Sequence, residues 1–137
     1  MSNNPIEIVG KGQSSQANLT IHVSIIKLHK SFLILVSDQP EYGLGTITLS
    51  SPPLLEGTKA MSSPFPIFGL KNNMIANMVG NIASQKFNTP VLSLVYILEQ
   101  NMKQELIMKT TLEAVLKAVE NCQSSKNEKL DEDQSLG

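Results

Sequence analysis

The sequence predicts an α+β fold in which an antiparallel five- or six-stranded sheet, with elements in the order β-β-β-β-α-β-α, is flanked by two helices. Strand patterns fill the first half of the chain, two helical patterns come later, and 137 residues suit one domain with a single core. Two stretches, 32–36 and 91–98, are apolar at nearly every position. A strand of that kind has two dry faces. Because two helices can cover only one face of such a sheet, we expect a second polypeptide to cover the other.

The first strand pattern follows a polar N-terminal segment. Residues 1–17 are expected to form a flexible arm or an added edge strand, and the single domain to cover 18–121. From Leu19 apolar and polar residues alternate, as in a strand with one wet face, until the phase shifts by one residue between Ile25 and Ile26. A β-bulge explains this shift, and so does a change from one covering layer to another.

Three further strands are expected before the first helix. The second and third, at 32–37 and 45–50, are joined by a turn at 38–43 that is rich in Asp, Pro and Gly. The third strand is short and half polar, which favours an edge position and predicts a meander of three hairpin-linked strands. After a proline-rich loop at 51–64 comes a fourth strand at 65–69, whose prolines confine it to an edge or to a strand start.

The second half of the chain contains both helices. The first is expected at 72–86, followed by a fifth strand at 91–98 and a second helix at 102–121. From 122 to 137 the chain is polar and acidic, and this composition predicts a disordered tail. The first helix has an apolar stripe made of Met74, Ile75, Met78, Val79 and Ile82.

Composition argues against several classes of partner. The net charge is −1, and all eleven basic residues are lysines. Without a basic field or arginine forks, we expect neither a nucleic acid nor a membrane as partner. The single cysteine, Cys122, cannot form an internal disulfide, and no secretion signal precedes the domain. We therefore expect a cytoplasmic protein, with the nucleus as a second compartment.

The sequence shows no arrangement of residues typical of catalysis. His22 and His29 are about 23 Å apart along an extended strand, and no thiol or carboxylate accompanies either at a recognisable spacing. The glycine pairs at 10–12 and 43–45 lack the spacing of nucleotide-binding loops. We expect no enzyme activity, no catalytic residue, no metal and no cofactor.

Three stretches carry a resemblance to a known family. They are the hairpin at 21–36, the segment 66–69 with the helix that follows it, and the segment 89–96 that leads into the last helix. Over about residues 18–120 the chain resembles the proteasome assembly chaperone 4-like family, the small subunits of a heterodimeric 20S proteasome assembly chaperone. It departs from that family in a longer loop at 51–64 and in its acidic tail.

The resemblance implies both a fold and a set of partners. The fold is a sheet flanked by helices. The partners are a sister proteasome assembly chaperone of the same fold, which forms a heterodimer, and proteasome α-subunits, chiefly α5, held while the α-ring of the 20S core assembles.

Under this interpretation one parity of the central strands meets the helices and the other meets the sister subunit. The residues expected to face the helices are Phe32, Ile34, Val36, Val91, Val95 and Ile97. The residues expected to bind the partner are Leu33, Leu35, Leu92, Leu94 and Tyr96. Two alternatives stay open: the parity is inverted, or the N-terminal arm and the 51–64 loop cover this face within the chain.

Two other functions are compatible with the sequence. One is a longin- or roadblock-like interaction subunit of a trafficking or signalling complex, which should place a helix between the early strands. The other is a small enzyme or ligand-binding domain, which would need a cleft with converging polar groups.

Overall fold

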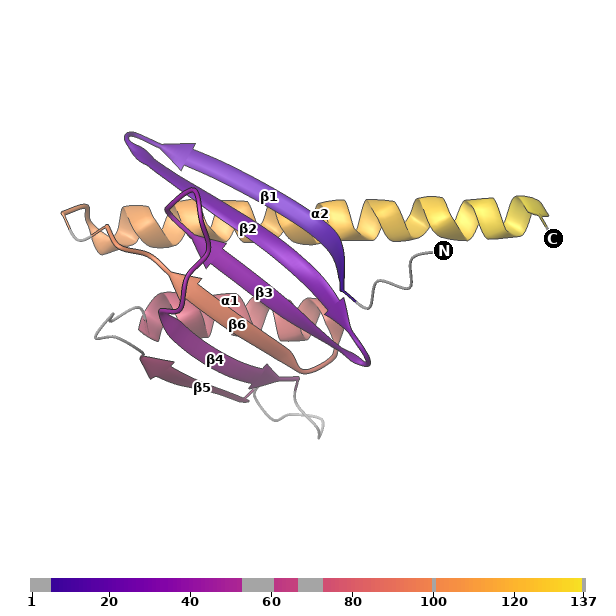
Figure 1. Ribbon diagram of the computed structural model, residues 1–137, viewed down its shortest axis with the longest axis horizontal. Helices are drawn as coiled ribbons and strands as arrows, with labels where there is room; N and C mark the ends of the chain where they lie inside the picture. Colours follow the sequence, from indigo (N-terminus) through magenta and orange to yellow (C-terminus); the bar gives the residue numbers. More distant parts are fainter. Residues whose placement is uncertain (1–5, 53–60, 67–72, 100, 137) are drawn as a thin grey trace.

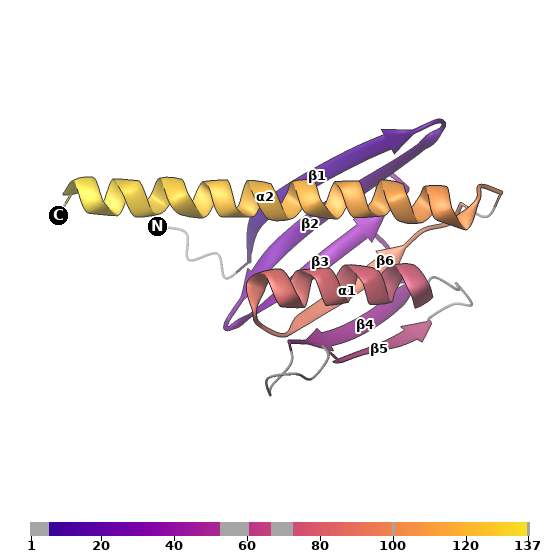
Figure 2. The same ribbon diagram turned by 180° about the vertical axis from the view of Figure 1, so that it is seen from behind.

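The sheet of this protein has six strands, and both helices pack on the same face of it (Figures 1 and 2). This architecture comes from a computed structural model that describes residues 6–52, 61–66, 73–99 and 101–136, with side chains described except in 61–66 and 123–136. The elements in chain order are β1 (Glu7–Gln16), β2 (Leu19–Leu28), β3 (Ser31–Ser37), β4 (Thr46–Ser51), β5 (Met61–Pro66), α1 (Asn73–Phe87), β6 (Val91–Tyr96) and α2 (Gln104–Leu136).

The strands lie in the order β1-β2-β3-β6-β4-β5. All neighbours are antiparallel except β3 and β6, which pair in parallel from Phe32 opposite Val91 to Ser37 opposite Tyr96. The predicted α+β class with a five- or six-stranded antiparallel sheet and two helices is confirmed, with six described strands and one parallel pair, β3 and β6. The N-terminal segment supplies the additional edge strand, β1, which was one of its two expected forms.

The predicted meander of the first three strands of the domain is wrong. It holds for β2 and β3, but β6 lies between β3 and β4. β6 is apolar on both parities, so a central position away from the edges of the sheet suits it. β4 therefore lies in the interior of the sheet, and its expected edge position is also wrong. The edge is β5, as its prolines predicted, although residues 67–69 of that predicted strand lie outside the described residues.

The core lies between the sheet and the helices. The phase shift is not a bulge of β2, because the pairing of β2 with β3 is continuous from His22 to Leu28. The register shift at this point lies on β1, between Ile8 and Gly10. Ile25 is fully buried in the core, and Ile26 points to the opposite face of the sheet. The large apolar side chains that are fully buried are Ile21, Val23, Ile25, Ile34, Val36, Ile75, Val79, Val91, Val95 and Val115.

The second helix is longer than predicted. The sequence indicated an end at Asn121 and a disordered tail from 122, whereas α2 continues to Leu136 and its last part projects past the sheet (Figure 1). No proline or glycine occurs between 122 and 136, so the chain has no helix breaker there. Among the described residues, no helix has the length and apolar character needed to cross a membrane.

Candidate protein-binding face

The face of the sheet that lies away from α1 and α2 is named the open face here. The predicted parity of β3 and β6 matches the structure: Ile34, Val36, Val91, Val95 and Ile97 belong to the core. Phe32 packs against this core and stacks on the Phe87 ring, with ring centroids 4.0 Å apart. The residues predicted to bind a partner lie on the open face, each half-buried: Leu33, Leu35, Leu92, Leu94 and Tyr96. Their contact with a partner stays a prediction.

The strand register brings more apolar residues to this face than the sequence indicated. Side chains directly opposite one another on neighbouring strands form rows across the sheet. Ile8 and Leu49, at the two ends of one row, are 51% and 58% exposed. At the strand spacing this row is about 19 Å long. We call it the apolar row, and it consists of Ile8, Ile26, Leu33, Leu92 and Leu49.

The next row along the strands is divided between polar and apolar residues. It is polar on β1 and β2 and apolar on β3, β6 and β4, and it consists of Lys11, Ser24, Leu35, Leu94 and Ile47. Ile8, Ile26, Ile47 and Leu49 were not among the predicted contact residues. The phase shift at Ile26 was the signal for one of them. The β4 pair was missed because this strand was expected at an edge of the sheet, and its neighbour β6 comes from a distant part of the sequence.

The loop between β3 and β4 limits the open face at one end. The Tyr42 hydroxyl lies 2.7 Å from the Ser24 hydroxyl, so the loop reaches back over β2. A Cβ atom on Gly43 would lie 2.9 Å from the Tyr96 ring, so the loop also packs closely on β6. Leu44 in the same loop is 49% exposed. The loop thus covers the Tyr96 end of the face and adds an apolar side chain beside it.

No other described element covers the open face. The N-terminal segment from residue 7 lies in the plane of the sheet as β1 (Figure 1), so it does not fold over this face. Residues 53–60 of the long loop lie outside the described residues. The exposed fractions of Ile8 and Leu49 show that this face leaves large apolar side chains in contact with solvent, which is a common property of protein-binding surfaces.

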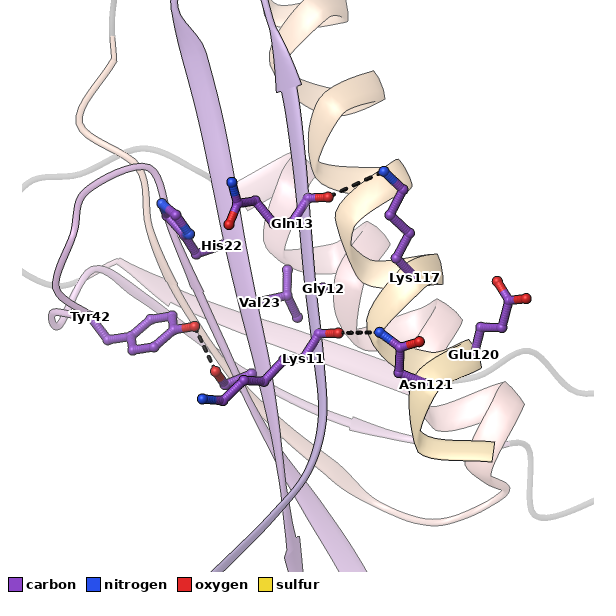
Figure 3. Close-up of a pocket in the computed structure, with 10 residues that line it drawn as sticks. Lys11, Gly12, Gln13, His22, Val23, Tyr42, Lys117, Glu120 and Asn121 are labelled. Atoms are coloured by element: carbon purple, nitrogen blue, oxygen red, sulfur yellow. Dashed lines mark hydrogen bonds between the residues drawn. The ribbon is translucent and has the colours of Figure 1, made fainter. Parts of the chain in front are cut away.

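Features at both edges of the sheet disfavour the addition of another strand. On β1, the Asn121 side chain donates to the Lys11 carbonyl at 2.6 Å, and the Lys117 ammonium donates to the Gln13 carbonyl at 3.3 Å (Figure 3). At the other edge, β5 contains Pro64 and Pro66, which have no N–H to donate. A protein partner would therefore contact the open face rather than extend the sheet.

Two glycines on β1 explain how α2 reaches that edge. A Cβ atom on Gly10 would lie 2.5 Å from the Ala118 carbonyl oxygen, and one on Gly12 would overlap the main chain of Ala114 and Ala118. The glycines of this segment therefore serve the close packing of a strand on a helix rather than phosphate binding.

A carboxylate strengthens the same contact. The Ser14 hydroxyl donates to Glu113 at 2.8 Å, and Gln16 donates to the same oxygen at 3.4 Å. The Ser14 hydrogen bond holds the pKa of Glu113 below its usual value, with smaller contributions from Gln16 and from Lys109 and Lys117.

A polar hollow of about 490 Å³ lies beside the open face, across β1 (Figure 3). Its lining includes Lys11, His22 and Tyr42 on one side of β1 and Lys117 and Asn121 on α2. His22 lies within β2 and His29 lies in the turn after it, so the two histidines occupy different places. The structure thus combines a helix-backed sheet with an apolar open face that has one polar corner.

Comparison with known proteins defines the fold more closely. The chain is similar to a protein in the crystal structure of a novel chaperone complex for yeast 20S proteasome assembly, with a TM-score of 0.57 and 13% sequence identity. The match covers 89% of this chain and 98% of that chain. At this identity the likeness establishes a shared fold. No protein-family model matches the sequence, and no curated protein matches it.

Proposed function

We propose that this protein is a subunit of a proteasome assembly chaperone that pairs through its open face with a sister chaperone of similar fold. The pair would bind proteasome α-subunits, chiefly α5, and promote assembly of the α-ring of the 20S core. The observation that carries this proposal is the apolar row, which crosses five neighbouring strands on the part of the open face that the β3–β4 loop does not cover. The shared fold with a chain of the yeast 20S assembly chaperone complex supports it.

The size of the open face fits a stable protein interface. A specific interface usually buries on the order of 800 Å² per partner, and a partner on this face would cover the apolar row, the apolar half of the second row and the exposed Leu44. The edges at β1 and β5, which disfavour another strand, favour face-to-face contact between two sheets, which is a common way to bury apolar strands. In this function the protein acts by binding, in the cytoplasm, and it needs neither a cofactor nor a metal.

The order of the elements disfavours the longin- or roadblock-like alternative. That class should place a helix between the early strands, and the described residues before α1 form strands, turns and loops. We therefore do not propose a trafficking or signalling role.

The test is affinity capture of the tagged chain from an extract of its own cells. We expect the sister chaperone and proteasome α-subunits without β-subunits, and we expect Leu94→Asp to abolish recovery of both. Leu116→Asp is the matched control, because Leu116 is 42% exposed on α2, on the other side of the sheet. Recovery of vesicle-coat or GTPase-regulator components would contradict this proposal and favour the trafficking or signalling alternative. Equal losses with the two variants would show that the open face is not the binding surface.

A further inference from the structure

The open face carries one formally charged side chain on the strands whose side chains are described. It is Lys11, which stands opposite Ser24 in the register, immediately beside the apolar row. Figure 3 shows its side chain on the Tyr42 side of β1, away from Lys117 and Asn121 of α2. The ammonium forms no ion pair among the described residues. A chain that covers the apolar row must therefore either pair with this charge or desolvate it.

The open-face strands of a second copy would not supply a counter-charge to Lys11. Two identical chains that meet through the open face are related by a two-fold axis lying in the interface. If the axis runs along the strands, β1 of one copy lies over the β4 side of the other, and Lys11 is placed toward the apolar Ile47. If the axis runs across the strands, β1 lies over β1, and Lys11 meets Ile8 or the other Lys11. Each arrangement buries an unpaired ammonium or opposes two like charges, and both are unfavourable.

We propose that Lys11 prevents the open face from pairing with a second copy and selects a different chain that places a carboxylate opposite it. This inference rests on the proposed function only in that the open face binds a partner. Charge complementarity of this kind contributes to the choice of partner more than to affinity, and rejection of the wrong partner by an unpaired charge is a general source of specificity.

The first experiment uses the purified chain alone, in sedimentation velocity over a series of concentrations. We expect the wild-type chain to be monomeric and Lys11→Met to dimerise with a dissociation constant lower by about tenfold or more. The bond from Asn121 uses the carbonyl group of Lys11, so the substitution leaves the attachment of β1 to α2 intact. Lys86→Met is the matched control, since Lys86 is an exposed lysine in the last turn of α1, on the other face of the sheet.

Adding Leu94→Asp to Lys11→Met should restore the monomer, because Leu94 lies on the open face. The proposal is overturned if the wild-type chain dimerises as tightly as Lys11→Met. It is also overturned if Lys11→Met self-associates no more than Lys86→Met, or if the double variant remains a dimer.

The second experiment tests the carboxylate on the partner. We compare recovery of the sister chain from cell extract with Lys11→Arg and Lys11→Glu, and we expect full recovery with arginine and a loss of about fivefold or more with glutamate. Equal recovery with both would exclude a carboxylate opposite Lys11. The first experiment uses the purified chain and no proteasome component, so it tests the role of Lys11 alone. The proposed chaperone role is tested separately, by comparing Leu94→Asp with Leu116→Asp in affinity capture.

Discussion

The two helices cover the same face of the sheet, but the surfaces beneath them differ. Under α2, Gly10 and Gly12 of β1 let the strand approach the helix main chain closely. Under α1, the strands present the hydroxyl groups of Thr48, Ser50 and Ser93, which are buried and have no hydrogen-bond partner among the described residues. Each unpaired buried hydroxyl costs about 1–3 kcal/mol. The α2 side of the molecule is therefore closely packed and hydrogen-bonded, whereas three buried hydroxyl groups on the α1 side have no partner among the described residues.

The difference is greatest in β4. This strand turns its hydroxyl residues toward α1 and its apolar residues, Ile47 and Leu49, toward the open face. A strand that served only the fold of its own chain would have the opposite pattern, with the apolar side chains inside. β4 thus places hydroxyl groups in the core and apolar side chains on the open face. This arrangement is what a surface for a second polypeptide requires.

The largest effect that could break this comparison comes from one glycine at each contact between sheet and helix, Gly12 of β1 under α2 and Gly80 of α1 above β4. Gly12→Ala should destabilise the protein by about 3 kcal/mol, because the added methyl group overlaps the main chain of Ala114 and Ala118 and neither can move alone. Gly80→Ala should change stability by about 1 kcal/mol or less. Its methyl group meets chiefly the Ser50 side chain, whose hydroxyl can rotate, and alanine favours the helix by about 1 kcal/mol. Urea denaturation measures the free energy of unfolding of both variants. Equal losses of stability in the two variants would contradict the difference in packing between the α1 and α2 sides.

A smaller effect comes from the hydroxyl groups themselves. Thr48→Val should stabilise the protein by about 1 kcal/mol, because it replaces a buried hydroxyl without a partner by a methyl group of similar shape. Thr110→Val is the matched control on α2, where the hydroxyl donates to the Leu106 carbonyl at 2.7 Å, and it should give no gain. The melting temperatures of the two variants, compared with that of the wild type, test this prediction. A loss of stability in Thr48→Val would mean that this hydroxyl group contributes to the fold.

The smallest effect concerns the carboxylate that joins β1 to α2. Since the pKa of Glu113 is lowered in the folded protein, its ionised form stabilises the fold above its usual value of 4.5, and this contribution is lost as the pH falls below that value toward the folded pKa. We expect Glu113→Gln to melt below the wild type at pH 7, and the difference to shrink at pH values under 4.5. Melting curves at several pH values measure it. A difference that widens on acidification would contradict the assigned sign.

Much of the candidate face could be predicted from the sequence. Consecutive apolar residues in the segments that became β3 and β6 indicated two dry faces, and their parity predicted which residues meet the helices. Because the sequence contains only two helical patterns, it indicated that helices of this chain would cover only one face of the sheet. These features depend on local alternation, which the sequence displays directly.

The remaining features depend on contacts between distant parts of the chain. The local sequence pattern of β6 does not predict that β6 pairs in parallel with β3 and lies between β3 and β4. Once β6 takes that place, β4 becomes an interior strand with its hydroxyl residues under α1, against the expectation that polar residues face water. The same holds for Gly12, because the need for glycine arises only where α2 crosses β1.

The most direct test of the central claim is residue-level footprinting, by carbene labelling and mass spectrometry, of the chain alone and in its captured complex. We predict that Leu92, Leu94 and Leu49 of the open face lose labelling in the complex, and that Leu116 and Met74 on the helices keep it unless an α-subunit is also bound. Unchanged labelling of the open-face leucines in an intact complex would contradict the claim that this face binds the partner.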